Sequence, residues 1–292
     1  MKNLKYAVLG ASNIDIAGIS KNALTLHDSN IGQVKISSGG VGRNICENLA
    51  RLGKKVSFFS AFAKDTFADF LQKELSELSI DFTNSYYTDK FETSSYLFVN
   101  DVEGEMYVAI NDMILIESVP ISYFEKILPL VNQHDVCVID TNWPIEVFSF
   151  LMENVKIPIC VDPVSLTKSE KCLPYLSKIH SFKPNLSEAQ HLSKKRTLED
   201  SAEVLLDAGV KQLFISLGSA GLYYATKDKS GIIPVSITKP VNTTGAGDAT
   251  MAGIVAGFGM PIEDKAKIAT RLAEICVMTN ETVAKNLNNK IF

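Results

Sequence analysis

Short apolar runs alternate with amphipathic segments along most of the chain. Continuous apolar runs bounded by glycine, proline or polar residues predict buried strands, and a spacing of three to four residues predicts helices. Strands are predicted over residues 5–10, 56–60, 136–140, 158–162, 180–184 and 212–216. Helices are predicted over residues 45–53, 66–78, 144–153, 186–192 and 197–208. Buried strands separated by helices predict an α/β fold with a doubly wound, mostly parallel sheet.

Two stretches interrupt this alternation and predict a small second sheet. Residues 15–38 lack a helical period and contain alternating pieces such as residues 33–36. Residues 93–99 and 106–110 flank a polar turn and predict a β-hairpin. We expect residues 15–38 and 91–111 to form a lid that covers a substrate and excludes water. The 292 residues are expected to form a single domain with this lid.

Composition and charge narrow the classes of function. A net charge of −4 without a dense basic run argues against nucleic-acid binding. The five cysteines are odd in number and lack Cys-x-x-Cys spacing, which argues against disulfide frameworks and zinc sites. The amino end does not resemble a signal peptide, and no apolar stretch has the length of a membrane span. We therefore expect a cytoplasmic protein without a membrane partner.

Polar residues follow the predicted strands, where open α/β sheets bind ligands. Asn13 and Asp15 come after the first strand and are candidates for binding hydroxyl groups. The alternative is that both residues form an ordinary turn. Further along, the glycine pair Gly39 and Gly40 permits close approach of a ligand to the backbone, and Asn44 at the start of a helix can bond hydroxyls.

The stretch around Asp248 suggests phosphoryl transfer to an alcohol. Gly245 and Gly247 allow a tight turn, and small residues over 249–257 predict a buried helix whose first amides point back at that turn. A helix amino terminus can hold a phosphoryl group while Asp248 takes a proton from the attacking hydroxyl. A positive φ is expected at this turn, so a β-branched residue at Gly247 should disturb it. The competing interpretation is a loop with an Asp cap.

Three segments resemble, in order and across nearly the whole chain, the marks of the ribokinase-like pfkB family of carbohydrate kinases. They are residues 39–44, 185–188 and 244–253. The resemblance implies a doubly wound α/β domain with a β lid. It implies that Asp248 is the base and that the amides of Gly245, Ala246, Gly247 and Asp248 form an anion hole.

The same resemblance assigns binding roles to further residues. It implies that Asn13, Asp15, Gly40 and Asn44, with Gly39 beside them, hold the sugar of the acceptor. Asn185 and Glu188 match the motif that organises magnesium, through water, and phosphate. Ser216, Gly218, Gly221 and Thr244 match positions on the phosphates and ribose of ATP, and Asn286 matches the closing of the adenine pocket.

Five segments are similar to the branch of the family that acts on pseudouridine: residues 39–53, 109–113, 140–142, 161–165 and 182–185. This likeness implies transfer of the ATP γ-phosphoryl group to the 5′-hydroxyl of pseudouridine, giving pseudouridine 5′-phosphate. Ser12, Asn111 and Asp112 are then candidates for contacts with the uracil base. The alternative for Asn111 and Asp112 is a turn that ends a strand.

The sequence departs from the family pattern in two places. Asn242 stands where the family commonly has an Asp that helps bind potassium, so potassium activation is not expected. Ala284 and Lys285 replace the family's closing Asn-Pro pair, so the phosphate donor need not be strictly ATP.

Two alternative functions stay open. The chain could be a related kinase for ribose, another nucleoside or a hexose, or a catalytically silent nucleoside-binding sensor. The apolar lid strands also suggest a homodimer formed through the lid.

Overall fold

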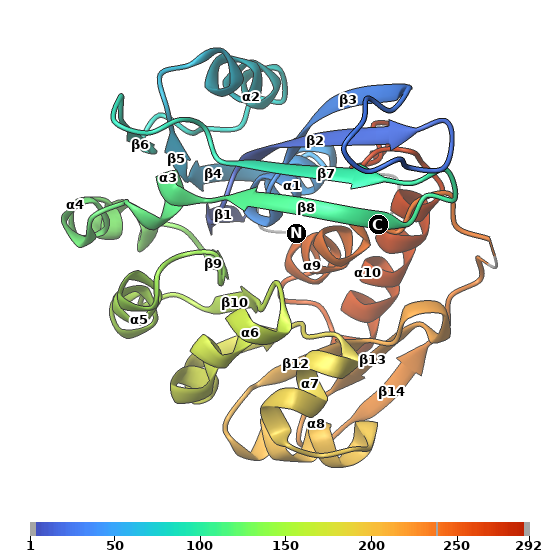
Figure 1. Ribbon diagram of the computed structural model, residues 1–292. Helices are drawn as coiled ribbons and strands as arrows, with labels where there is room; N and C mark the ends of the chain where they lie inside the picture. Colours follow the sequence, from blue (N-terminus) through green and yellow to red (C-terminus); the bar gives the residue numbers. More distant parts are fainter. Residues whose placement is uncertain (1–3, 238, 289–292) are drawn as a thin grey trace.

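The main sheet has eight strands in the order β14-β13-β12-β11-β10-β9-β1-β4 (Figure 1). It belongs to a computed structural model that describes residues 4–237 and 239–288. The parallel strands are β1 (Lys5–Leu9), β4 (Lys55–Phe59), β9 (Val136–Asp140), β10 (Ile159–Asp162), β11 (Ile179–Phe182) and β12 (Gln212–Ser216). The strands β13 (Leu222–Ala225) and β14 (Ser230–Ile233) are antiparallel. The predicted mostly parallel sheet is therefore confirmed.

Helices cover both faces of this sheet. One group packs together and consists of α1 (Val41–Arg51), α9 (Ala246–Ala256) and α10 (Ile262–Val277). Figure 1 shows on the other side α4 (Ile121–Val131), α5 (Ile145–Asn154), α7 (Leu186–Ser193) and α8 (Leu198–Asp207). The remaining helices are α2 (Thr66–Glu77), α3 (Ile114–Glu117), α6 (Leu166–Ser169), and the 3₁₀ helices η1 (Glu170–Lys178) and η2 (Gly218–Ala220). This arrangement is the predicted doubly wound fold.

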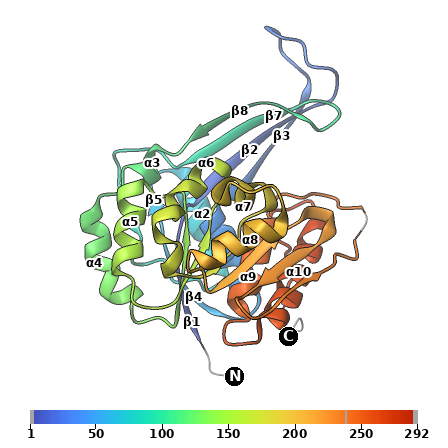
Figure 2. The same cartoon turned by 90° about the horizontal axis from the view of Figure 1, so that it is seen from below.

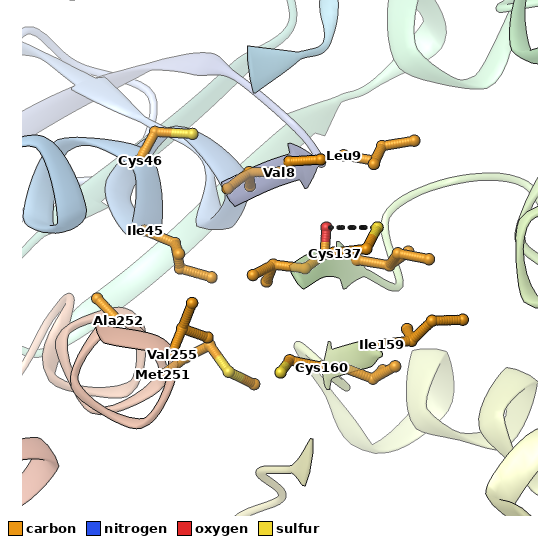
Figure 3. Packing of buried hydrophobic residues seen from close by; sticks show 14 of the residues in the cluster. Val8, Leu9, Ile45, Cys46, Cys137, Ile159, Cys160, Met251, Ala252 and Val255 are labelled. Atoms are coloured by element: carbon orange, nitrogen blue, oxygen red, sulfur yellow. Dashed lines mark hydrogen bonds between the residues drawn. The ribbon is translucent and has the colours of Figure 1, made fainter. Parts of the chain in front are cut away.

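The core fills both sides of the central strands, against α1 and α9 on one face and against α4 and α5 on the other. In Figure 3, Val8 of β1 and Cys160 of β10 point toward side chains of α1 and α9, whereas Leu9 of β1, Cys137 of β9 and Ile159 of β10 lie on the opposite face of the sheet. The helix residues labelled there are Ile45, Cys46, Met251, Ala252 and Val255. All five cysteines are buried and free, so they act as small apolar side chains.

Small residues let α9 lie deep in the structure. A Cβ atom added at Gly253 would lie only 2.5 Å from Cα of Ala269, so α9 and α10 touch backbone to backbone. This close packing fixes α9 against α10. No helix within residues 4–237 and 239–288 is both long and apolar enough to cross a membrane.

A second sheet has four strands in the order β3-β2-β7-β8. Its strands are β2 (Asn13–Ser20), β3 (Gly32–Gly39), β7 (Ser95–Asn100) and β8 (Met106–Asp112). Figure 2 shows these strands extending away from the body of the molecule. Because β2 starts at Asn13, both Asn13 and Asp15 lie in a strand, and the alternative of an ordinary turn is wrong for them. That this sheet closes over a substrate stays a prediction.

Candidate functional site

The turn before α9 has the geometry of an anion-binding helix start. Gly245 precedes the helix with φ +82°, and a Cβ atom there would collide with the carbonyl oxygen of Thr282. The positive φ therefore belongs to Gly245, whereas Gly247 lies inside the first helical turn, which corrects the expectation for Gly247. The amide of Ala246 donates to the carbonyl of Thr243 at 3.3 Å. The amides of Gly247 and Asp248 are thus the better candidates for binding an anion.

Asp248 lies in this first turn and is hydrogen-bonded to Asn44 of helix α1. Nδ2 of Asn44 donates to Oδ2 of Asp248 over 2.8 Å. Burial raises the pKa of Asp248 to about 8, and the negative charge of Asp162 adds to the rise. The hydrogen bond from Asn44 and the ammonium group of Lys183 act in the opposite direction. A carboxylate with such a pKa can take up a proton near neutral pH.

Lys183 is a site residue that the sequence analysis did not single out. Its Nζ lies 3.1 Å from Oδ2 of Asp162, and a Cβ atom added at Gly247 would lie 3.3 Å from the same nitrogen. Burial acts to lower the pKa of Lys183, but Asp162, Asp248 and Glu188 outweigh it and the pKa is raised. A charged ammonium therefore lies beside the start of α9. Its position near the end of the strand predicted over residues 180–184 was a signal that could have found it.

The predicted acceptor-binding residues gather around the start of α1, whose Asn44 contacts Asp248. Nδ2 of Asn13 donates to Oδ1 of Asp15 over 2.7 Å, and burial is the main cause of a raised pKa at Asp15. Gly40 has φ +99°, which only glycine adopts readily, and it precedes α1. A side chain at Gly39 would collide with the Asp15 carboxylate. Within the described part of the chain, the buried Oγ of Ser12 has no hydrogen-bond partner, so it is available to a ligand.

A cleft of about 1160 Å³ lies beneath the four-stranded sheet. Asp15, Tyr96 and Phe98 line it from the sheet, and Thr244 and residues 280–283 line it from the opposite side. The rings of Tyr96 and Phe98 lie 5.5 Å apart between centroids and form an apolar surface on the cleft. The sequence analysis missed this aromatic pair, although its alternate positions in a predicted strand place both rings on one face.

The two candidates for uracil contacts at the end of β8 are not brought together. Asn111 lies opposite Tyr96, whereas Asp112 lies opposite Ser95 on the other face of the sheet. The carboxylate of Asp112 accepts from the amide of Ile114 at 3.2 Å. Asp112 therefore shows the strand-ending role that was its alternative, and only Asn111 shares a face with the aromatic pair.

The candidates for the phosphate-donor side meet at the ends of β11 and β12. Asn185 and Glu188 form a reciprocal capping box at the start of α7, with bonds of 2.8 and 2.9 Å. The backbones of Asn185 and Ser216 form an isolated parallel β-bridge. Within the described residues, the Oγ of Ser216 is buried without a hydrogen-bond partner. No three His, Cys, Asp or Glu side chains of the described chain are grouped to hold a metal ion. Amide and carboxylate oxygens are ligands that magnesium takes alongside water, and the magnesium role of Asn185 and Glu188 stays a prediction.

The remaining donor-side candidates are spread more widely. Gly218 and Gly221 have φ +59° and +108° in a turn after β12, where the Leu217 amide donates to the Gly221 carbonyl at 2.9 Å. A side chain at Gly218 would meet open space, so backbone conformation alone explains this glycine. Thr244 lines the cleft beneath the lid, but the other donor-side candidates do not. Asn286 is exposed and its neighbour Lys285 lines the cleft instead.

Comparison with known proteins gives consistent matches over nearly the whole chain. Residues 3–289 match the model described as pfkB family carbohydrate kinase. Pseudouridine kinase from Escherichia coli K12 is 36% identical, covering 96% of this chain and 94% of that protein. An uncharacterized sugar kinase from the same organism, YeiI, is 31% identical over 92% of this chain and 76% of that protein. The crystal structure of ribokinase from Thermotoga maritima superposes with a TM-score of 0.86 at 22% identity, covering 96% and 94% of the two chains.

Proposed function

Since the chain belongs to the pfkB family of carbohydrate kinases, whose members transfer a phosphoryl group to an alcohol, we propose that its acceptor is pseudouridine. The reaction moves the γ-phosphoryl group of ATP to the 5′-hydroxyl of the nucleoside and yields pseudouridine 5′-phosphate and ADP. The 36% identity with the E. coli pseudouridine kinase, over almost all of both chains, supports this acceptor.

The proposed mechanism rests on the contact between Asn44 and Asp248 at the start of α9. Asp248 takes the proton of the attacking 5′-hydroxyl, for which its raised pKa suits it. The first-turn amides of α9 and the ammonium of Lys183 offset the negative charge of the transferred group. Asn13, Asp15 and Asn44 hold the ribose so that its 5′ oxygen faces Asp248.

Magnesium, held through water near Asn185 and Glu188, offsets charge on the triphosphate when it is bound. The capping box keeps these two side chains at a fixed position at the start of α7. Ser216, which is bridged to Asn185, brings a buried hydroxyl to the same region. These residues therefore orient the phosphate donor, while the residues around Asp248 orient the acceptor.

The uracil base is assigned to the cleft beneath the lid. An uncharged base is held by stacking and by amide or hydroxyl partners rather than by ion pairs. Tyr96 and Phe98 offer the stacking surface, Asn111 lies on the same sheet face, and Ser12 offers an unpartnered hydroxyl. Closure of the lid over the nucleoside would exclude water, which otherwise competes as an acceptor.

A coupled assay of ADP release with magnesium and ATP tests the proposal. Pseudouridine, uridine, adenosine and ribose are compared, and the product mass and the phosphorylated oxygen are determined. Strong preference for pseudouridine with phosphate on the 5′ oxygen is the expected result. Preference for ribose, another nucleoside or a hexose would rule out pseudouridine as the acceptor but would keep the proposed phosphoryl transfer to an alcohol. No turnover with any acceptor would favour the silent sensor.

A further inference from the structure

We propose that Asp140 is a positioning residue whose carboxylate fixes two acceptor-binding segments against each other and against the sheet. This role rests on the proposed function, because it concerns where the acceptor lies relative to Asp248. Asp140 ends β9, directly beside the end of β1, and is 1% exposed. Its hydrogen bonds to the backbone explain the buried carboxylate without a contact to the substrate.

One carboxylate accepts three backbone amides from three segments. Oδ2 accepts from the amide of Ala11 at 2.9 Å and from that of Gly42 at 3.0 Å. Oδ1 accepts from the amide of Asn142 at 2.9 Å. Ala11 leads into Ser12 and Asn13, and Gly42 lies between Gly40 and Asn44. The two segments that carry the candidate acceptor contacts therefore share a single oxygen atom.

These segments also touch each other through glycine. A Cβ atom at Gly10 would lie 2.8 Å from Cα of Gly42, and one at Gly42 would lie 2.7 Å from Cα of Gly10. The amide of Arg43 donates to the carbonyl of Ala11 at 3.1 Å. No side chain separates the two backbones, so a shift of one segment is passed directly to the other.

A shift of these two segments would reach Asp248 through helix α1. Gly42 and Asn44 lie in the first turn of α1, and Asn44 donates to Asp248 at 2.8 Å. If the bond from Gly42 to Asp140 is lost, the start of α1 is free to move and Asn44 moves with it. A displacement of about 1 Å at reacting groups can cost on the order of 100-fold in rate.

The location of the charge explains why a carboxylate is needed. Asp140 lies at the amino end of α1, where the helix dipole favours a negative group. Asp162 is its register neighbour on β10 and repels it, while the Lys168 ammonium attracts it. A neutral amide of the same shape keeps the volume, but one of its two positions carries an NH2 donor, which faces a backbone N–H in either orientation, so it cannot accept all three amides without a shift of the segments.

The variant Asp140→Asn tests this role against Asp135→Asn. Asp135 lies beside the opposite end of the same strand pair and accepts the amide of Lys5 at 2.9 Å, far from the acceptor segments along the strands. Both variants are assayed at saturating ATP with varied pseudouridine, then with varied ATP, and melting temperatures are recorded. For Asp140→Asn we expect about a 10-fold or larger rise in the KM for pseudouridine with the KM for ATP within about twofold. For Asp135→Asn we expect both constants unchanged.

Several outcomes would overturn the role of Asp140. An unchanged acceptor KM would do so, as would equal rises in the two KM values together with a lower melting temperature, which indicate general loss of structure. If Asp140→Asn does not fold, Asp140→Glu keeps the charge and displaces it by one methylene, and the same acceptor-specific rise is expected. Failure of both variants to fold, with Asp135→Asn folded, would assign Asp140 to stability alone. A wild-type protein without turnover on any acceptor would instead overturn the proposed function.

Discussion

Asn44 and Asp248 lie 204 positions apart in the sequence and are joined by a hydrogen bond of 2.8 Å. This bond links the first turn of α1, which carries acceptor-binding candidates, to the first turn of α9, where the phosphoryl group is expected. It therefore places an acceptor-binding candidate beside the proposed proton acceptor. The hydrogen bond also favours the charged form of Asp248, because the amide donates to the carboxylate.

Replacing Asp248 by Asn should remove the proton acceptor while keeping its shape. We expect kcat to fall by roughly two or more orders of magnitude, as for loss of a general base, with little change in nucleoside affinity. Turnover in the coupled assay and direct binding of pseudouridine by calorimetry measure the two effects separately. A variant that keeps wild-type turnover would remove Asp248 from the mechanism.

The pH dependence of kcat/KM follows from the pKa of about 8 at Asp248. Only the deprotonated carboxylate accepts a proton, so activity should rise with pH and level off above that pKa. Asn44 lowers the pKa of Asp248, so Asn44→Ala should shift the acidic limb to higher pH. Profiles of both proteins, recorded with magnesium in excess, check this. A limb that stays in place would show that another group controls it.

Gly245 should tolerate a side chain less well than Gly247. Alanine at Gly245 must adopt φ +82° and collide with Thr282, which should cost on the order of 1–3 kcal/mol. Alanine at Gly247 is helical and meets only the end of the Lys183 side chain at 3.3 Å. Gly247→Ala should therefore keep its melting temperature. It should lose turnover, because the added methyl group crowds the Lys183 ammonium that is proposed to offset the charge of the transferred group. Thermal unfolding and the coupled assay distinguish the two variants, and equal destabilisation would contradict this account.

Hydrophobic patterning predicted the sheet well because its central strands are buried on both faces. The predicted and observed strands coincide at residues 136–140 and 212–216. The hydrophobic pattern did not predict α10 or the antiparallel strands β13 and β14. These strands are short, and β14 alternates between exposed and partly buried positions, so their pattern over four residues is weak.

The start of α1 and the partners within the site could not be derived from local sequence. The helix begins at Val41, before the predicted residue 45, because Gly40 with φ +99° forms its cap. The bond between Asn44 and Asp248 and the ion pair between Lys183 and Asp162 depend on how distant strands are ordered in the sheet. Residue types at strand ends indicated where the site lies, but the pairing requires the fold.

Potassium should have little effect on activity. The Oδ1 of Asn242 accepts from the amide of Thr244 at 2.9 Å, and the side chain carries no charge to attract a cation. We expect rates in potassium and in tetramethylammonium to agree within about twofold at equal ionic strength. Asn242→Asp restores a carboxylate and should gain potassium dependence. Strong activation of the unaltered protein by potassium would contradict the prediction.

The homodimer predicted through the lid should depend on the sheet face turned away from Tyr96. Leu97 and Ile110 are register neighbours on that face and are 38% and 64% exposed. Covering such an apolar surface with a second copy would stabilise an otherwise exposed sheet. We expect the wild-type protein to have the mass of a dimer by light scattering at micromolar concentration, and Ile110→Lys to have that of a monomer. Ile232→Lys, at a 50% exposed position on β14, is the matched control and should stay dimeric. A monomeric wild-type protein, or a dimer that survives Ile110→Lys, would rule out assembly through this face.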